Sequence, residues 1–492
     1  MPDHGGDTGG ALPHDAIRRI VMAMIPAIFL AAIDGTVVSV ALLTIGRELR
    51  SFELTSWVVA GYLVSSTVAT PIYGKLSDLH GRRPLLLVAI AVHLIASVLC
   101  GLAQDMHQLI AFRILQGLGS GGLLALAQAT IADLAPGPQR GRYQGYLAGT
   151  FATAAISGPI LGGLLTEYLS WRAIFWLNLP IGALALWLVH RVLPGPERAG
   201  VRHAIDYLGA LLLAGGLGAL LIGLTRIGQG HGWTEASTLM LFGLSALLLA
   251  LCALQERRAE EPLLPPVVMR NPVILAACAI LGMQFFVMVS AVNLLPMRMQ
   301  AVGLASAQEV ALRMLPMTLA TPAGAFSAGQ VMLRTGHYRI AIFVGTGLTM
   351  TAQLGLALAP PASPWLTAGL MLLLGYSLGL TMSPCLVAAQ MSVPRGLVGV
   401  ATSTTGLCRS LGGAIGVATL TSLLFDEVRS GTAAAPAAGA GRAGMLELFG
   451  MAPPELLRSA FQHAFLASSV AALIAFAVAF TLPAGRLDHG RH

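Results

Sequence analysis

The sequence contains little charge and almost no lysine. Only 10% of its 492 residues are charged, 55% are hydrophobic, and Lys75 is the single lysine. A soluble globular domain of this size does not tolerate such a composition, so the expected solvent is lipid. The scarcity of lysine also excludes ATP hydrolysis through a P-loop. That motif needs a lysine between a glycine-rich turn and Ser or Thr, whereas Lys75 follows Pro71-Ile72-Tyr73-Gly74 and precedes Leu76.

Cysteine is also scarce, and nothing in the chain resembles a metal or catalytic site. The five cysteines lie in or at the edge of apolar runs without metal-ligand spacing, and the twelve histidines are scattered. No polar segment is long enough for a catalytic domain, so we expect no enzyme activity, no metal and no cofactor. The net charge of +7 does not indicate nucleic acid, because the basic residues lie in short connections between apolar runs.

Apolar runs of about 20 residues, the length of helix that crosses a bilayer, recur along the whole chain. The first run is too long for a cleaved signal peptide and lacks a convincing cleavage site. The fourteen predicted transmembrane helices are 20–43, 55–73, 84–104, 109–132, 143–167, 171–193, 204–226, 236–256, 272–296, 308–333, 338–359, 363–391, 397–425 and 460–482.

The spacing of these runs groups the helices as six, two and six. The predicted domains are a cytoplasmic tail 1–19, an N-terminal six-helix bundle 20–195, two extra helices in 196–262, a C-terminal six-helix bundle 263–482 with an outer loop 426–459, and a second cytoplasmic tail 483–492. Of the 29 Lys and Arg residues, 18 flank the inner ends of the helices when the N-terminus is placed inside, and 8 flank the outer ends. This bias predicts a multi-pass protein of the cytoplasmic membrane with both termini in the cytoplasm.

A worn internal repeat supports two related bundles. The connection 74–83 follows the second helix of the first bundle, and Gly329, Gly336 and Arg339 occupy comparable places after the second helix of the other bundle. Transporters made of parallel repeats have this organisation.

Three short motifs occur in a fixed order. Residues 74–83 read GKLSDLHGRR, the segment from Arg113 reads RILQGLG, and the segment from Ser157 reads SGPILGG. WRAIF from Trp171 and NLPIG from Asn178 follow them. This ordered set resembles the major facilitator superfamily, specifically its fourteen-helix drug:proton antiporter branch, and the resemblance covers essentially the whole chain. It implies an all-α membrane fold of two six-helix bundles plus two extra central helices.

The resemblance also implies roles for residues in these motifs. Gly74, Asp78, Gly81, Arg82 and Arg83 form a conformational latch in a short loop, and Asp78 faces the start of a late helix of the other bundle near Arg395. Gly158, Pro159, Gly162 and Gly163 form the marker of antiporters, in which small residues let helices approach closely. The alternative for Arg82 and Arg83 is that they only determine topology.

Asp34 and Arg113 are the candidates for proton coupling. Asp34 lies about 21 Å along the first helix from Ile20, deep in the hydrocarbon zone. A carboxylate at that depth takes up protons readily, and a partner such as Arg113 opposes this, so alternation between partners makes a proton switch. Two alternatives stay open: Asp34 forms a permanent structural salt bridge, or Arg113 reaches the headgroups instead.

The substrate is predicted to be a small amphipathic compound. Asp34 is the only deep carboxylate and Arg409 the only equally deep base, so cationic drugs are not specifically predicted. Candidate cavity residues are Gln116, Gln284, Met288, Asn293, Tyr376 and Arg409. Flexible methionine side chains adapt to varied ligands.

The sequence therefore predicts a monomeric secondary exporter that moves amphipathic drugs or antibiotics outward across the lipid bilayer in exchange for protons. The alternatives are a dedicated exporter of one endogenous metabolite or antibiotic, and a membrane sensor that binds ligand without transporting it.

Overall fold

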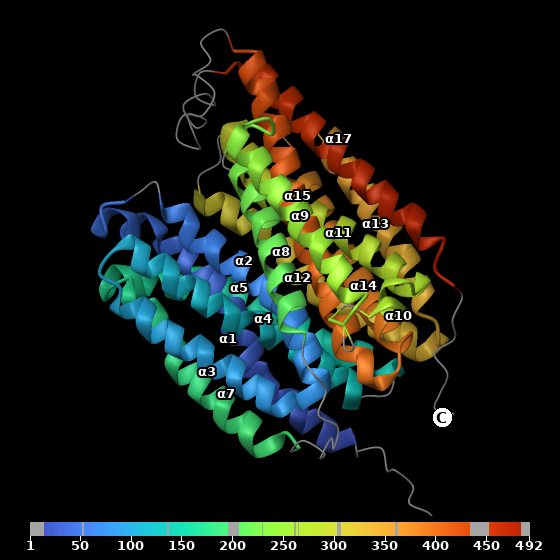
Figure 1. The fold of residues 1–492 in the computed structure, drawn as a ribbon. Helices are drawn as coiled ribbons and strands as arrows, with labels where there is room; N and C mark the ends of the chain where they lie inside the picture. Colours follow the sequence, from blue (N-terminus) through green and yellow to red (C-terminus); the bar gives the residue numbers. More distant parts are fainter. Residues whose placement is uncertain are drawn as a thin grey trace, which may run out of the picture.

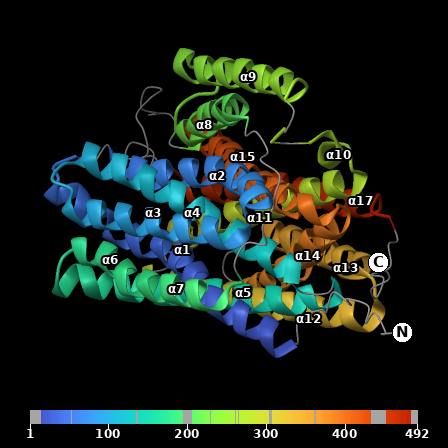
Figure 2. The same cartoon turned by 60° about the horizontal axis from the view of Figure 1, so that its bottom comes forward.

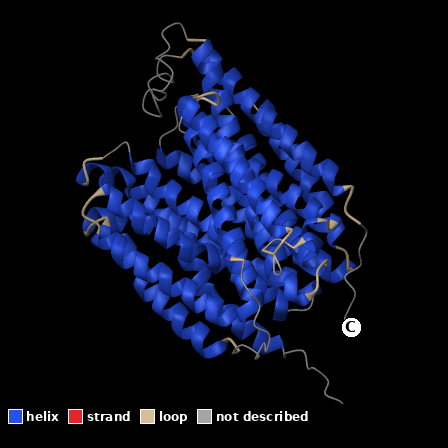
Figure 3. Cartoon of the chain, viewed as in Figure 1, coloured by secondary structure: helices blue, strands red, loops and turns tan. Residues whose placement is uncertain are grey.

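The computed structural model is helical throughout the part of the chain that it describes (Figure 3), with no strand in those residues. The described residues are 14–51, 54–134, 137–194, 206–228, 230–259, 262–263, 265–302, 307–359, 363–432 and 452–483.

Helices run through this part of the chain; Figure 1 labels all of those named here except the short α6, which is labelled in Figure 2. They are α1 (His14–Glu48), α2 (Thr55–His80), α3 (Arg82–Leu102), α4 (Met106–Leu134), α5 (Gly137–Tyr168), α6 (Arg172–Trp176), α7 (Asn178–Val192), α8 (Tyr207–Gly228), α9 (Ala236–Glu256), α10 (Pro266–Met269), α11 (Pro272–Ala301), α12 (Ala307–Thr335), α13 (Tyr338–Leu358), α14 (Pro364–Met391), α15 (Val398–Ser430) and α17 (Pro454–Ala479).

Each predicted transmembrane range lies largely within one of these helices, and the range 171–193 is divided into α6 and α7 at Leu177. Among the described residues, twelve helices, with α6 and α7 counted as one, are long and apolar enough to cross a membrane. The long helices α2 and α12 are not among the twelve. Both carry more polar residues than their neighbours: α2 contains a run of Ser and Thr, and α12 contains Glu309, Arg313 and Arg334.

Two predicted loops have the wrong bounds. The connection 74–83 is not a loop, because α2 continues through Pro71 and Gly74 to His80 and ends only at Gly81, which has a positive φ. The outer loop 426–459 is shorter than predicted, because α15 continues to Ser430 and α17 begins at Pro454, where proline fits the first turn of a helix. The Ala- and Gly-rich stretch 433–441 lies outside the described residues.

The helices pack into two groups. The first, called here the N-terminal bundle, contains α1 to α7, and the second, the C-terminal bundle, contains α11 to α17 (Figure 1). The bundles touch where α5 packs on α12 and where α2 packs on α15.

The two bundles use the same contact between their second and fourth long helices. A Cβ atom at Gly117 or Gly121 of α4 would collide with the backbone of α2, and a Cβ atom at Gly375 or Gly379 of α14 would collide with the backbone of α12. In both bundles, glycines four residues apart therefore bring two helices into direct backbone contact.

The weak internal repeat of the sequence is also visible at the ends of α2 and α12. Gly81 ends α2 with φ 88°, and Gly336 follows the end of α12 with φ 69°, conformations that strongly favour glycine. After each glycine an arginine reaches the last helix of its own bundle. Arg83 Nη2 donates to the carbonyl oxygen of His190 at 2.6 Å, and Arg339 Nη2 donates to that of Phe480 at 3.1 Å.

The helices α8 and α9 form a hairpin on the outside of the molecule (Figure 2). Of the two, α8 lies inward and packs on α2 of one bundle and on α15 of the other. Leu213 and Leu217 of α8 share an apolar cluster with Val68 of α2 and Leu407 of α15. The hairpin thus covers a line along which the two bundles meet.

Candidate functional site

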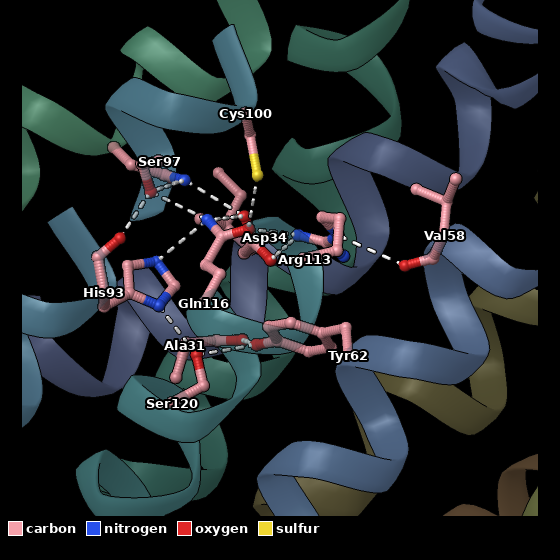
Figure 4. A network of polar contacts seen from close by, with 12 residues as sticks. Ala31, Asp34, Val58, Tyr62, His93, Ser97, Cys100, Arg113, Gln116 and Ser120 are labelled. Carbon is pink, nitrogen blue, oxygen red and sulfur yellow. Dashed lines mark hydrogen bonds and ion pairs between the residues drawn. The ribbon is translucent and has the colours of Figure 1, made fainter. Parts of the chain in front are cut away.

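A buried polar network lies inside the N-terminal bundle (Figure 4). Two helices contribute polar side chains at helical spacing, so that each set lies on one face: Arg113, Gln116 and Ser120 from α4, and His93, Ser97 and Cys100 from α3. The network also includes Asp34 from α1, Tyr62 from α2 and Asn178 from the start of α7.

Asp34 and Arg113 form the centre of this network. Arg113 Nη1 lies 2.5 Å from Asp34 Oδ2, and each side chain is only 1% exposed. The sequence-based alternative in which Arg113 reaches the headgroups is wrong for this structure, because its guanidinium points into the bundle. The pair is fully desolvated, so its charges are strongly coupled.

Three neutral side chains hold the Asp34 carboxylate in place. Gln116 Nε2 and Asn178 Nδ2 both donate to Asp34 Oδ1 at 3.0 Å. Ser97 Oγ accepts from the same two amides at 2.7 and 3.1 Å. Both oxygens of Asp34 are thus occupied by donors, which favours the ionised carboxylate in this conformation.

Arg113 makes two further hydrogen bonds. Nη1 donates to Gln116 Oε1 at 2.6 Å, and Nε donates to the backbone oxygen of Val58 at 3.3 Å. The guanidinium carbon lies 4.3 Å from the ring centroid of Tyr62. Arg113 therefore connects α4 to both α1 and α2.

His93 extends the network toward Tyr62. His93 Nδ1 and Ser120 Oγ share a hydrogen bond of 2.8 Å, and the Tyr62 hydroxyl donates to Ser120 Oγ at 2.8 Å. On its other side, His93 Nε2 lies 3.5 Å from the Gln116 amide nitrogen. This second titratable group is therefore separated from Asp34 by one amide.

A second polar contact joins the two bundles at the start of α15. Asp78 Oδ1 accepts from the backbone nitrogen of Gly399 at 3.0 Å, and Oδ2 accepts from that of Val400 at 2.9 Å. A carboxylate at a helix N-terminus interacts favourably with the helix dipole. The resemblance implied this placement of Asp78, and the structure has it.

The other latch residues differ in what they contact. Arg82 pairs with Asp78 at 2.5 Å and with Asp133 at 2.8 Å, so it supports the contact from within its own bundle. Gly74 lies against Ser403 and the carbonyl oxygen of Gly399, where a side chain would not fit. Arg83 is not at this contact, because it binds the end of α7 instead.

The glycines of the antiporter marker on α5 are not equivalent. A Cβ atom at Gly158 would collide with Thr36, and one at Gly162 would lie 2.8 Å from the Val37 carbonyl oxygen, both on α1. A Cβ atom at Gly163 would meet nothing within 4 Å. Only the first two glycines therefore permit the close α1–α5 contact, while Pro159 is exposed.

The predicted cavity residues do not form one group. Gln116 is wrong as a cavity residue, because it is fully buried in the Asp34 network. Gln284 is likewise fully buried, and its amide donates to Thr381 at 3.4 Å.

The other predicted cavity residues are at least partly accessible. Met288 and Tyr376 are half-buried against apolar clusters of the C-terminal bundle, and Asn293 is exposed. Arg409 is half-buried, with its guanidinium carbon 5.0 Å from the Phe285 ring centroid.

Six network residues are not predicted from the sequence: Tyr62, His93, Ser97, Cys100, Ser120 and Asn178. A signal for two of them was present, because His93 and Ser97 are polar, four residues apart, and inside an otherwise apolar run. Asn178 was read only as part of a motif, and no periodicity links it to the distant Asp34.

Comparison with known proteins agrees with this architecture. Residues 24–417 match the family profile of the Major Facilitator Superfamily. An uncharacterized MFS-type transporter of Mycobacterium tuberculosis is 35% identical over 86% of this chain, which spans only 62% of that relative. The multidrug transporter protein MdtP of Bacillus subtilis is 31% identical over 84% of this chain and 76% of its own length.

Solved structures share the fold. The human organic anion transporter MFSD10 has a TM-score of 0.65 at 16% sequence identity, with 95% of this chain and 100% of the other covered. The family match covers most of the sequence and includes both the Asp34 network and the Asp78 contact. This chain belongs to the major facilitator superfamily of membrane transporters.

Proposed function

We propose that the protein is a proton-coupled antiporter that exports small amphipathic compounds. The observation that carries the proposal is the Asp34–Arg113 pair, a proton-accepting group held at 2.5 Å from its counter-charge inside the bundle. Protonation of Asp34 would remove the charge that holds Arg113 and weaken the connection between α1 and α4. The multidrug transporter among the relatives supports an amphipathic substrate.

The proposed cycle couples this switch to the Asp78 contact. In the structure, the bundles are joined where Asp78 meets the first turn of α15 and where Gln390 Nε2 donates to the Gln128 carbonyl oxygen at 3.4 Å. Asp34 is only 2% exposed, so it exchanges protons in another conformation. If these contacts open and the residues around Asp34 rearrange, the substrate site would become accessible in turn from each side of the membrane.

We further propose that α2 and α12 also cross the membrane, which gives fourteen spans with both termini in the cytoplasm of a bacterial cell. The polar Ser65 and Thr67 of α2 are buried in the protein, at 5% and 6% exposure. On α12, Leu312, Leu319 and Phe326 form an exposed stripe with seven-residue spacing, as expected for a lipid-facing side.

The proposed transporter uses protons as the coupling ion, needs no cofactor and works as a monomer.

Expression in an efflux-deficient bacterium tests the proposal. Wild-type protein should raise tolerance to several compounds of a chemically diverse panel, and Asp34→Asn should not. In proteoliposomes, substrate addition should collapse an imposed proton gradient only with the wild-type protein. Full proton-coupled transport by Asp34→Asn would refute the role of Asp34. Tolerance to no compound of the panel would favour a dedicated exporter of one endogenous metabolite.

A further inference from the structure

Arg409 is a charged residue of the C-terminal bundle whose charge no described residue balances. It has neither a hydrogen bond nor an ion pair with any residue in the described part of the chain. The centroid of the Phe285 ring of α11 lies 5.0 Å from its guanidinium carbon. All five N–H donors of the guanidinium are thus available to a ligand.

The neighbours of Arg409 on α15 show which way it faces. Leu407 and Leu411, two residues before and after, lie on the opposite side of the helix and pack in the cluster with α8. The hairpin of α8 and α9 is on the outside of the molecule (Figure 2), so Arg409 faces inward.

The close contacts of nearby glycines refine this direction. Gly406, three residues earlier, approaches Thr70 of α2, and Gly412, three residues later, lies against the backbone of Gly282 on α11. Arg409 is between these two contacts. It therefore lies where the N-terminal bundle meets the C-terminal bundle, about 16 Å along α15 from Val398.

The carboxylates of the C-terminal bundle are too far along their helices to neutralise Arg409. In the described residues of α11 to α17 they occur only in first turns, as Glu309 and Glu455, and near the end of α15, as Asp426 and Glu427. Asp34 belongs to the other bundle and is already engaged by Arg113.

A half-buried guanidinium without a counter-charge is costly inside a membrane protein, so a functional partner is expected. Its planar fork of donors fits a carboxylate or sulfonate through two parallel hydrogen bonds. Phe285, beside Arg409, and Val289, which lies against Gly413 one turn further along α15, are apolar and half-buried. An acid group beside an aromatic body matches this combination.

We propose that Arg409 binds the acid group of the exported compound, so that the substrates are amphipathic organic anions. This inference rests on the proposed export function and assigns its substrate class. Arg409 binds the carboxylate or sulfonate, and Phe285 contacts the apolar body. Asp34 remains the proton carrier in the other bundle, so substrate and proton use separate groups.

Two probes with one aromatic skeleton test the proposal. The sulfonate is 8-anilino-1-naphthalenesulfonate, and N-phenyl-1-naphthylamine is its uncharged counterpart. Radiolabelled forms of both are supplied to inside-out proteoliposomes with an acidic lumen, and uptake is measured with wild type, Arg409→Gln and Arg409→Lys. Arg429→Gln, near the far end of the same helix, is the control.

We expect wild type to take up the sulfonate, and Arg409→Gln to reduce that uptake about tenfold or more while uptake of the amine changes less than about twofold. Arg409→Lys should retain part of the sulfonate uptake, and Arg429→Gln all of it. Thermal unfolding of each purified variant separates loss of binding from loss of fold, and equilibrium dialysis of the sulfonate with folded protein gives a second measure of binding.

Each contrary result has a separate meaning. Equal sulfonate uptake by wild type and Arg409→Gln would overturn the role of Arg409. Proton-driven uptake of the amine but not of the sulfonate by wild type would overturn the anionic substrate class and leave export intact. Uptake of neither probe, without binding of the sulfonate, would count against both this inference and the proposed export.

Discussion

Arg113 and Asp34 lie 2.5 Å apart in an ion pair that buries both side chains almost completely. Such a pair need not stabilise the fold, because desolvation offsets much of the attraction between the charges. Its position in the middle of a bundle fits the role in the transport cycle that we propose for it.

Removing one partner should destabilise the protein more than removing both. Asp34→Ala leaves a buried, unpaired guanidinium, and we expect a loss of about 3–5 kcal/mol in unfolding free energy. The double variant Asp34→Ala with Arg113→Met should recover about half of this loss or more, because no buried charge remains. Thermal or denaturant unfolding of the purified protein measures the difference.

Asp426→Ala is the matched control for the loss of a carboxylate. Asp426 is exposed near the end of α15, and the substitution should change stability by less than about 0.5 kcal/mol. If Asp34→Ala and the double variant lost the same amount of unfolding free energy, the unpaired charge of Arg113 would not be the cause of the destabilisation.

Gly162 and Gly163 offer a direct test of the antiporter marker, because the same substitution at adjacent positions should have opposite effects. A Cβ atom at Gly162 would lie 2.8 Å from the Val37 carbonyl oxygen, so Gly162→Ala must separate α1 from α5. We expect a loss of about 1–3 kcal/mol in stability, with reduced transport. Gly163→Ala has free space and should stabilise the helix by up to about 1 kcal/mol.

Unfolding and transport are measured together for this pair. If Gly162→Ala retained wild-type stability and transport, the close approach of α1 and α5 would not be the reason for glycine at that position. Damage by Gly163→Ala would instead indicate a role for its open space, such as contact with substrate.

The architecture was largely predictable from the sequence, because it depends on apolar length. Lipid requires long helices, and runs of about 20 apolar residues are visible without any knowledge of contacts. Helix ends were less predictable. The end of α2 depends on Gly81, and the start of α17 depends on Pro454, whereas hydropathy alone ends each helix where the apolar residues end.

The candidate site was predictable only in part. Asp34 and Arg113 stand out because charge is rare inside apolar runs. The sequence predicts Gln116 as a cavity residue but does not predict its place in the Asp34 network, because burial depends on neighbours that are distant in sequence. Asn178 contacts Asp34 from α7, and only the folded bundle brings those two residues together.

Asp78 should control how often the contact between α2 and α15 opens. Asp78→Asn removes the negative charge from the first turn of α15 and one of two accepting oxygens. We expect the conformation in which Asp78 contacts α15 to lose about 1 kcal/mol of stability relative to the open one, so that the open conformation is about fivefold more populated. Thr402, 1% exposed and on the first turns of α15, reports this opening when replaced by cysteine in a cysteine-free protein. Maleimide labelling should be about fivefold faster with Asp78→Asn.

Asp133→Asn is the control for the Asp78 contact. Asp133 pairs with the same Arg82 at 2.8 Å, but it lies on α4 and has no hydrogen bond to α15 among the described residues. Its effect on labelling of the introduced cysteine should be smaller. Equal acceleration by both variants would indicate that Arg82 alone, and not the helix start, controls the opening.

The position of the α8–α9 connection distinguishes fourteen spans from twelve. If α2 and α12 both cross, the connection that contains Gly232 lies outside the cell and Ala259, after α9, lies inside. If neither crosses, every helix from α3 to α11 runs through the membrane in the opposite direction. Gly232 then lies inside the cell and Ala259 outside. Cysteine at Gly232 in a cysteine-free protein should therefore react with a membrane-impermeant maleimide in intact cells, and cysteine at Ala259 only after lysis. The opposite pattern would show that the polar residues of α2 keep it from crossing, despite the burial of Ser65 and Thr67 within the bundle.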